Sequence, residues 1–197
     1  MRVDQALADA GFEIVHRFAV DAVVHEPGLE RLAGAPVGIL IGNTRTLWPR
    51  FRERAELDIA HPLDRYTEQT IDRLVPAGGH CYYSHRRYDG TFLPFQRLAV
   101  AAGLGALSPT QLVIHPIYGP WFALRAVVVC GGEPPATLPI DRVCRCDGHC
   151  KAALSRALAT TGPEPWRAWL AVRDACTVGR DWRYSEDQIR YHYTKTF

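Results

Sequence analysis

The sequence predicts an α+β fold in which helices flank a central antiparallel or mixed sheet. Short apolar or β-branched runs bounded by Pro and Gly are mixed with segments of helical length, and hairpin-like spacings separate some of the runs. This order does not follow the regular strand–helix–strand series of a parallel sheet. No GxGxxG follows a predicted strand and no Walker A sequence occurs, so the usual phosphate-binding motifs of parallel sheets are missing.

The first half of the chain alternates between expected helices and strands. In order, they are a helix at 3–10, strands at 12–24 and 36–42, helices at 47–57 and 62–74, a strand at 81–85 and a helix at 94–102. Gly11 and Gly103 end the first and last of these helices. The run at 36–42 is short and apolar, which indicates a buried strand, and Asn43 or Thr44 can cap the helix that follows. Pro62 near the first helical position and an acid in the first turn mark the helix at 62–74.

The second half is expected to contain a pair of strands and then a helical C-terminal part. The strands are expected at 111–115 and 121–129, a Pro-rich loop at 131–139, and helices at 150–160, 164–176 and 185–193. Ser185 and Gln188 have the three-residue spacing of a capping box, which predicts the start of the last helix. The 197 residues are expected to form a single domain, of which 143–197 is the helical part.

Composition places the chain among ordinary soluble proteins, since 47% of its residues are hydrophobic and 22% are charged. A net charge of +2 is too small for the field that nucleic-acid binding requires. No apolar run is long enough to cross a bilayer, and the first residues lack the apolar region of a signal peptide. We therefore expect a cytoplasmic monomer or homodimer whose six cysteines are reduced. Cys81 and Cys176 stand in apolar settings typical of small core residues.

The segment 114–125, IHPIYGPWFALR, is the most unusual part of the sequence. A turn with an imidazole, two prolines, a glycine and a large aromatic side chain leads directly into an apolar strand. Rigid loops that carry aromatic and basic groups are typical of binding sites. His115 and Trp121 are therefore candidates to line a pocket for a flat, largely apolar ligand. The alternative is a hydrogen-bonded loop histidine in a turn that is purely structural.

Two arginines are candidates to bind an anion. Arg125 lies in an apolar strand, where a guanidinium is costly unless an anion or a hydrogen-bond acceptor meets it. The expected helix at 164–176 places Trp166, Trp169 and Arg173 on one face. Arg125 and Arg173 could converge on a carboxylate through bidentate pairing. The alternatives are an internal ion pair for Arg125, for instance with Asp174, and a core stripe of tryptophans, which we favour for Trp169.

A compact cluster of thiols follows the Pro-rich loop. Its members are Cys144, Cys146, His149 and Cys150, in the sequence CRCDGHC. Three thiols and an imidazole could bind zinc or an iron–sulfur cluster, with Cys130 as a further ligand. The CxC spacing differs from the CxxC of zinc ribbons and ferredoxins, and a reactive thiol pair is the alternative.

Two blocks of the sequence resemble cytosolic cobalamin-processing proteins of the CblC type, the methylmalonic aciduria and homocystinuria type C protein family. Residues 114–116 and 119–125 resemble the family's IHPxxGGWFAxR, and residues 166–169, 173–175 and 183–188 resemble its WRDW, RDA and RYSEEQ. A looser match covers 37–74. The stretch AGLGAL at 102–107 is similar to a segment of epoxyqueuosine reductases and reductive dehalogenases, which bind cobalamin and carry iron–sulfur clusters.

The resemblance implies a flavin-reductase- or nitroreductase-like α+β fold that binds cobalamin (vitamin B12), a cobalt corrinoid, with its lower base off the metal. It implies removal of the upper axial ligand by decyanation with a reduced flavin such as FMN, or by glutathione-dependent dealkylation. The loop beside the corrin would comprise His115, Pro116, Tyr118, Gly119, Pro120 and Trp121. Arg125 and Arg173 fall on arginines with which the family holds glutathione, and Trp169 accompanies them as a residue that binds the thiol cosubstrate.

The chain also departs from these relatives. Pro120 replaces the second glycine of the family's Gly-Gly-Trp, which stiffens the loop and removes a backbone donor. The regular cluster motifs of epoxyqueuosine reductases are missing. Three functions stay open: an oxidoreductase or alkyltransferase acting on cobalamin, an iron–sulfur or zinc redox protein built on Cys144, Cys146 and Cys150, and a non-catalytic corrinoid carrier.

Overall fold

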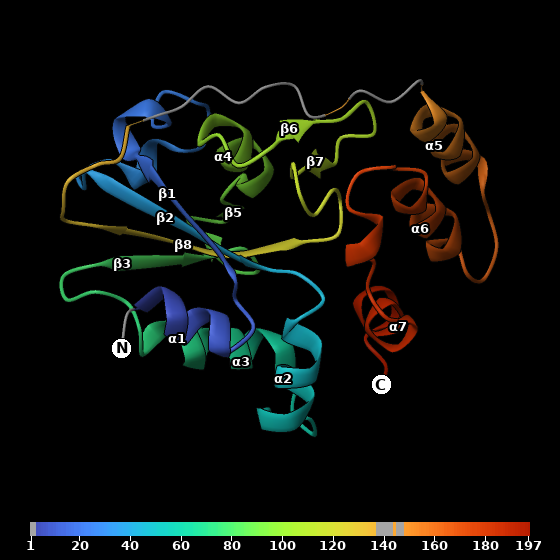
Figure 1. Ribbon diagram of the computed structural model, residues 1–197, viewed down its shortest axis with the longest axis horizontal. Coiled ribbons are helices and arrows are strands. Elements are labelled where there is room, and N and C mark those ends of the chain that lie inside the picture. The colour runs from blue at the N-terminus through green and yellow to red at the C-terminus, as the bar shows by residue number, and fades with distance from the viewer. Residues whose placement is uncertain (1–2, 137–143, 145–147) are drawn as a thin grey trace. The chain divides into compact units, whose positions relative to one another are not determined.

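The computed structural model describes residues 3–136, 144 and 148–197 (Figure 1). The chain divides into two compact units. The sheet unit comprises residues 1–104 and 123–139, and the helical unit comprises residues 105–122 and 140–197. The chain thus leaves the sheet unit after Leu104, contributes a segment of 18 residues to the helical unit and returns at Ala123. That segment contains the unusual loop identified in the sequence.

The sheet unit is built on an antiparallel sheet. In spatial order, its strands within the described residues are β1 (Ile14–Ala19), β2 (Val37–Asn43), β8 (Ala123–Cys130) and β3 (His80–Tyr83). Every residue of β2 is buried, as the short apolar run predicted. The last five residues of β8 are buried too, which fits its central place between β2 and β3.

Helices cover both faces of this sheet (Figure 1). On one side lie α1 (Val3–Asp9), α2 (Leu47–Arg54) and α3 (Pro62–Asp72), and on the other lies α4 (Phe95–Ala101). His16 of β1 faces α4, because its Nε2 lies 2.7 Å from the carbonyl oxygen of Ala102. Smaller elements of the unit are the 3-10 helices η1 (Val20–Ala22) and η2 (Glu30–Leu32) and the hairpin of β4 (Arg87–Tyr88) and β5 (Thr91–Phe92).

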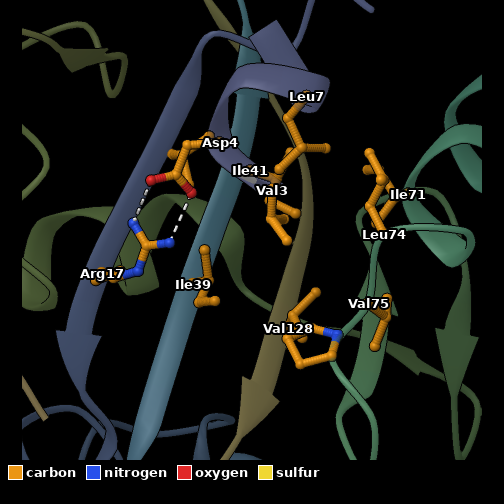
Figure 2. Close-up of a pocket in the computed structure, with 12 residues that line it drawn as sticks. Val3, Asp4, Leu7, Arg17, Ile39, Ile41, Ile71, Leu74, Val75 and Val128 are labelled. Atoms are coloured by element: carbon orange, nitrogen blue, oxygen red, sulfur yellow. Dashed lines mark hydrogen bonds and ion pairs between the residues drawn. The ribbon is translucent and has the colours of Figure 1, made fainter. Parts of the chain in front are cut away.

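A small cavity lies between the sheet and the helices α1 and α3 (Figure 2). Alternate residues of the strands, such as Ile39 and Ile41, face Leu7 of α1 and Ile71 of α3 across it. Its volume of about 10 Å³ is that of one water-sized probe. This space is therefore a gap in core packing and is too small to hold a cofactor.

The helical unit contains a short hairpin, three α-helices and a 3-10 helix among its described residues. These elements are β6 (Ala106–Leu107), β7 (Val113–Ile114), α5 (His149–Ala159), α6 (Trp166–Asp174), η3 (Arg180–Trp182) and α7 (Glu186–Thr194). Small side chains let α5 and α6 pack closely, with Ala153 and Ala157 against Val172. A second core cluster consists of Trp121, Tyr184 and Ile189.

The predicted α+β class and most predicted elements are confirmed, but the predicted strand pair is wrong. The segment 121–129 does not pair with 111–115, because β8 begins at Ala123 and pairs with β2 and β3, while β7 pairs with β6. A strand buried on both faces needs neighbours on both sides, and distant parts of the chain provide them. The strand expected at 12–24 ends at Ala19 because the chain turns there into η1.

The predicted start of the last helix is confirmed, since Ser185 is the residue directly before α7, but two predicted side-chain caps are wrong. The hydroxyl of Ser185 donates to Asp187 and does not cap α7, and Gln188 is buried at 1% exposure. The residue before α2 is Thr46, so neither Asn43 nor Thr44 caps that helix. Asn43 and Thr44 are both fully buried and form hydrogen bonds within the sheet unit. No helix within the described residues is both long enough and apolar enough to cross a bilayer.

Candidate functional site

The loop from His115 to Trp121 is closed by its own backbone. The N–H of His115 donates to the carbonyl of Gly119 at 3.0 Å, and the N–H of Gly119 donates to the carbonyl of His115 at 2.9 Å. The N–H of Trp121 then donates to the carbonyl of Tyr118 at 3.0 Å. The tip between these bonds carries Pro116, which is exposed, and Ile117, which is 59% exposed. The loop is thus a rigid turn that presents apolar side chains at its tip.

His115 is held within this loop by its ring. Its Nδ1 accepts hydrogen bonds from the N–H groups of Ile117 at 3.1 Å and Tyr118 at 3.3 Å. Since Nδ1 accepts, the neutral ring carries its proton on Nε2. The ring stacks on Tyr118 at 4.5 Å, and Tyr118 in turn meets Trp182 edge-on at 4.7 Å. His115 is therefore both a structural part of the turn and a ring with a fixed tautomer.

Trp121 lies in the core of the helical unit. Its side chain is 1% exposed and meets Tyr184 at 5.6 Å between ring centroids. Trp166 and Leu170 of α6 pack against the same cluster, and Trp166 also stacks on Tyr193 of α7 at 5.5 Å. Trp121 thus anchors the loop to the helices, and the side chains that the loop exposes belong to its tip.

Two arginines lie over the ring of Trp121 but differ in their partners. The guanidinium carbon of Arg173 is 5.9 Å from the ring centroid and that of Arg183 is 5.6 Å. Arg183 is bound by Asp174 at 2.8 Å and Glu186 at 2.6 Å, and these hydrogen bonds raise its pKa. Arg173 forms no ion pair among the residues that the structure describes. Among the described residues, a carboxylate therefore balances the charge of Arg183 but not that of Arg173.

The tryptophan stripe of α6 does not form the expected core. Trp166 is partly buried and packs against the cluster of Trp121, Tyr184 and Ile189, but Trp169 is 41% exposed, so the core role favoured for it is wrong. The two tryptophans are three positions apart on α6, and the buried cluster reaches only the side of the helix that carries Trp166 and Leu170. Trp169 is therefore an exposed aromatic side chain one turn before Arg173 on α6.

Arg125 lies at an irregularity of the sheet unit. The register between β2 and β8 pairs Ile41 with Ala126 and Gly42 with Leu124, so Arg125 is the additional residue of a bulge. Its Nε donates to Oδ1 of Asn43 at 2.6 Å. Asp174, which the sequence offered as an ion-pair partner for Arg125, binds Arg183 instead. Arg125 and Arg173 belong to different units, so their convergence on one ligand stays a prediction.

The cysteine cluster is described in part. Cys150 is buried on α5, where it is the second residue, and Cys144 is partly exposed. Cys146 lies outside the described residues. Within the described part of the chain, no group of three metal-ligating side chains comes together. A zinc or iron–sulfur site on Cys144, Cys146 and Cys150 stays a prediction.

Sequence reasoning missed two residues of the site. Asn43, predicted as a candidate helix cap, follows a buried strand directly, and this position indicates that its amide needs a partner inside the fold. Arg183 stands in the sequence only as part of the RYSEDQ block. Its spacing of three residues from Glu186 was the available signal for an ion pair.

Comparison with known proteins gives structural matches. No family model and no curated protein matches the sequence. Among solved structures, the B12-trafficking protein CblC of C. elegans has a TM-score of 0.70 at 16% identity, over 96% of this chain and 88% of that one. Epoxyqueuosine reductase from Streptococcus thermophilus has a TM-score of 0.54 at 12% identity, over 93% of this chain and 66% of that one.

A second epoxyqueuosine reductase, from Bacillus subtilis, has a TM-score of 0.51 at 13% identity, over 92% of this chain and 65% of that one. The chain thus spans about two thirds of the length of these reductases. These matches confirm the predicted α+β class of flavin-reductase or nitroreductase type. Identities this low show the fold alone. The chain has the fold of the CblC-type B12-trafficking protein, the type that its two C-terminal sequence blocks resemble.

Proposed function

We propose that this protein binds cobalamin and processes its upper axial ligand. The observation that carries the proposal is the closed loop at 115–121. It combines a sequence that resembles the corrin-side loop of the CblC type with a rigid backbone and an exposed apolar tip at Pro116 and Ile117. A corrin ring is a large flat ligand with an apolar face, and a preformed apolar surface binds such a ligand without an ordering cost.

The tautomer of His115 defines what this residue offers to a corrinoid. Because Nδ1 accepts two backbone N–H groups, Nε2 carries the proton and is a hydrogen-bond donor. With its proton on Nε2, the neutral imidazole would not ligate cobalt in place of the lower base. The assignment is compatible with cobalamin bound with its base off and without a histidine on the metal.

The arginines would serve a cosubstrate that carries carboxylates. Arg173 keeps a guanidinium without an ion pair among the described residues, fixed over Trp121. A carboxylate of glutathione matches the paired donors of a guanidinium. In the dealkylation reaction, the thiolate attacks the alkyl carbon, a sulfur–carbon bond forms, and the electrons of the cobalt–carbon bond remain on cobalt as cob(I)alamin. Holding the carboxylates would place the thiol for this attack, which favours the reaction by orientation.

An anaerobic spectral titration tests the binding step. Addition of the protein to methylcobalamin or cyanocobalamin should convert the corrin spectrum to its base-off form. Ile117→Glu should weaken binding at least tenfold, because it places a charge on the apolar tip. Leu158→Glu is the matched control, since Leu158 is an equally apolar side chain of the helical unit and is 68% exposed. An unchanged spectrum with the wild-type protein would refute the proposal.

Addition of glutathione or reduced FMN to the complex tests the chemistry. Methylcobalamin should lose its alkyl group and form cob(I)alamin or its oxidised products. Arg173→Ala should raise the KM for glutathione. Arg167→Ala, which removes an exposed ion pair with Glu164 and a contact with the ring of Trp166, should leave that KM unchanged. A complex that retains its upper ligand with both glutathione and reduced FMN would be that of a corrinoid carrier.

A further inference from the structure

A buried polar network holds the side chain of Arg125. The guanidinium Nε donates to Asn43 Oδ1 at 2.6 Å, and the exposed fraction of Asn43 is 0%. The amide nitrogen of Asn43 donates to the carbonyl of Thr44 at 2.8 Å. That second bond fixes the orientation of the amide, because only its nitrogen can donate to a carbonyl. Oδ1 is therefore the atom that must face Arg125.

The network continues to a carboxylate. The backbone N–H of Thr44 donates to Oε1 of Glu13 at 3.0 Å, and the hydroxyl of Thr44 donates to the same oxygen. Thr44 is fully buried. Glu13 Oε2 is also buried and has no hydrogen-bond partner among the described residues. Glu13 thus holds Thr44 in place, and this fixes the carbonyl of Thr44 that accepts the hydrogen bond from Asn43.

The backbone of Arg125 is fixed as well. Arg125 is the additional residue of the bulge between β2 and β8, and its carbonyl accepts a hydrogen bond from the N–H of Ser84 at 2.9 Å. Bulges commonly redirect a side chain beside a functional site. A network of buried polar groups costs more free energy to form than apolar packing of the same volume. Its presence beside Arg125 therefore indicates that the fold must hold this guanidinium in one orientation.

We propose that Asn43 is a positioning residue for Arg125, supported by Thr44 and Glu13. Asn43 accepts the hydrogen bond from Nε of Arg125 and thereby fixes the plane of the guanidinium. The terminal nitrogens in that plane bind an anion. Bidentate recognition of a carboxylate requires such a plane. The identity of the anion as the carboxylate of a thiol cosubstrate rests on the proposed function. The role of Asn43 in orienting the guanidinium does not.

The first test needs no ligand. The Nε–H of Arg125 should give a slowly exchanging resonance in proton–nitrogen correlation spectra, because the bond to Asn43 shields it from water. Asn43→Ala should remove or broaden this resonance. Thr44→Val, which is nearly isosteric, should accelerate its exchange. Thr67→Val is the matched control: Thr67 is also buried in the sheet unit, but its hydroxyl donates to Leu63 within α3. An Arg125 resonance that is identical in Asn43→Ala and the wild type overturns the proposal.

The second test measures glutathione binding by calorimetry on the cobalamin complex. Asn43→Ala should raise the Kd for glutathione about tenfold, as expected when a bond to a charged group is lost, and should leave the Kd for cobalamin unchanged. Thr44→Val should raise the Kd for glutathione about threefold, and Thr67→Val should leave it unchanged. In the double variant with Arg125→Ala, the effect of Asn43→Ala should disappear, because Asn43 acts only through that arginine.

The two proposals fail in different ways. If Arg125→Ala leaves glutathione and cobalamin binding unchanged while the Arg125 resonance depends on Asn43, the assignment of the thiol cosubstrate to Arg125 is wrong and the positioning role stands. If Arg125→Ala weakens glutathione binding but Asn43→Ala and Thr44→Val do not, the positioning role is wrong. Additive effects in the double variant contradict it as well. Thr44→Val retains the side-chain volume, so this comparison also covers the case in which Asn43→Ala does not fold.

Discussion

Gly119 and Val178 lie in direct backbone contact. A β-carbon at Gly119 would fall 1.9 Å from the carbonyl oxygen of Val178, and one at Gly179 would fall 2.2 Å from the carbonyl carbon of Tyr118. Two glycines therefore allow the loop at 115–121 to press against the segment before η3. The loop that we propose as the corrin-side surface is held in place by this contact as well as by Trp121.

Gly119→Ala should destabilise the protein severely. Gly119 has a φ of +57°, which costs about 1–2 kcal/mol for a residue with a β-carbon, and the clash with a backbone oxygen adds to that cost. We expect a loss of about 4 kcal/mol or more in the free energy of unfolding, measured by urea denaturation. Gly90→Ala is the control, since its φ is +79° but a β-carbon there meets nothing within 4 Å. Equal losses in the two variants would contradict the close approach.

Trp121 and Trp169 should differ sharply in their contribution to stability. Trp121 is 1% exposed and Trp169 is 41% exposed. Trp121→Ala opens a cavity in the core of the helical unit and should cost about 3–5 kcal/mol. Trp169→Ala should change the free energy of unfolding by less than about 1 kcal/mol. Denaturant unfolding followed by circular dichroism measures both, and a larger loss for Trp169→Ala would contradict the assignment of the two rings.

Glu68 should give a stability contribution that depends on pH. Burial alone would raise the pKa of its carboxyl, but hydrogen bonds from Arg86 at 2.6 Å and His85 at 2.7 Å outweigh it and lower the pKa below 4.5. The folded protein therefore holds this proton less tightly than the unfolded chain. The stabilisation is present above the unfolded pKa and is lost as the pH falls through the lower, folded pKa.

The variant Glu68→Gln tests this dependence. At pH 7 it should be about 1 kcal/mol less stable than the wild type, in the range of a partly exposed ion pair. The difference should shrink and vanish as the pH falls through the lowered pKa of the folded protein, because the carboxylate is then protonated. Glu56→Gln, at an exposed position, should match the wild type throughout. If the difference in the free energy of unfolding between Glu68→Gln and the wild type grew as the pH fell, the prediction would be contradicted.

Cys81 should be unreactive in the folded protein. Burial raises the pKa of its thiol to about 12, against a smaller opposing effect of the hydrogen bond with Tyr83. Only the thiolate reacts with alkylating agents, so almost none of the reactive form is present at pH 8. Iodoacetamide followed by peptide mass spectrometry should leave Cys81 unmodified in the folded protein and modify it in guanidinium chloride. Equal rates in the two conditions would show that the thiol is accessible and ordinary.

Local signals in the sequence placed most elements correctly. Pro62 and the acid after it marked the start of α3, and the helix indeed begins at Pro62. The apolar run at 36–42 became β2, whose residues are all buried. The two C-terminal blocks indicated a fold of the CblC type, and the structural comparison agrees. These features depend on residues close together in the chain, so periodicity and motif spacing are sufficient to find them.

Local patterns were enough to predict the fold class and to single out the loop at 115–121 and the two candidate arginines. The folded structure was needed to place β8 between β2 and β3, to distinguish the buried Trp121 from the exposed Trp169, and to join Asn43 to Arg125. All three depend on contacts between distant segments. Strand pairing, burial and side-chain partners are set by segments far apart in sequence, here 82 residues for Asn43 and Arg125, and no local pattern records which segments meet.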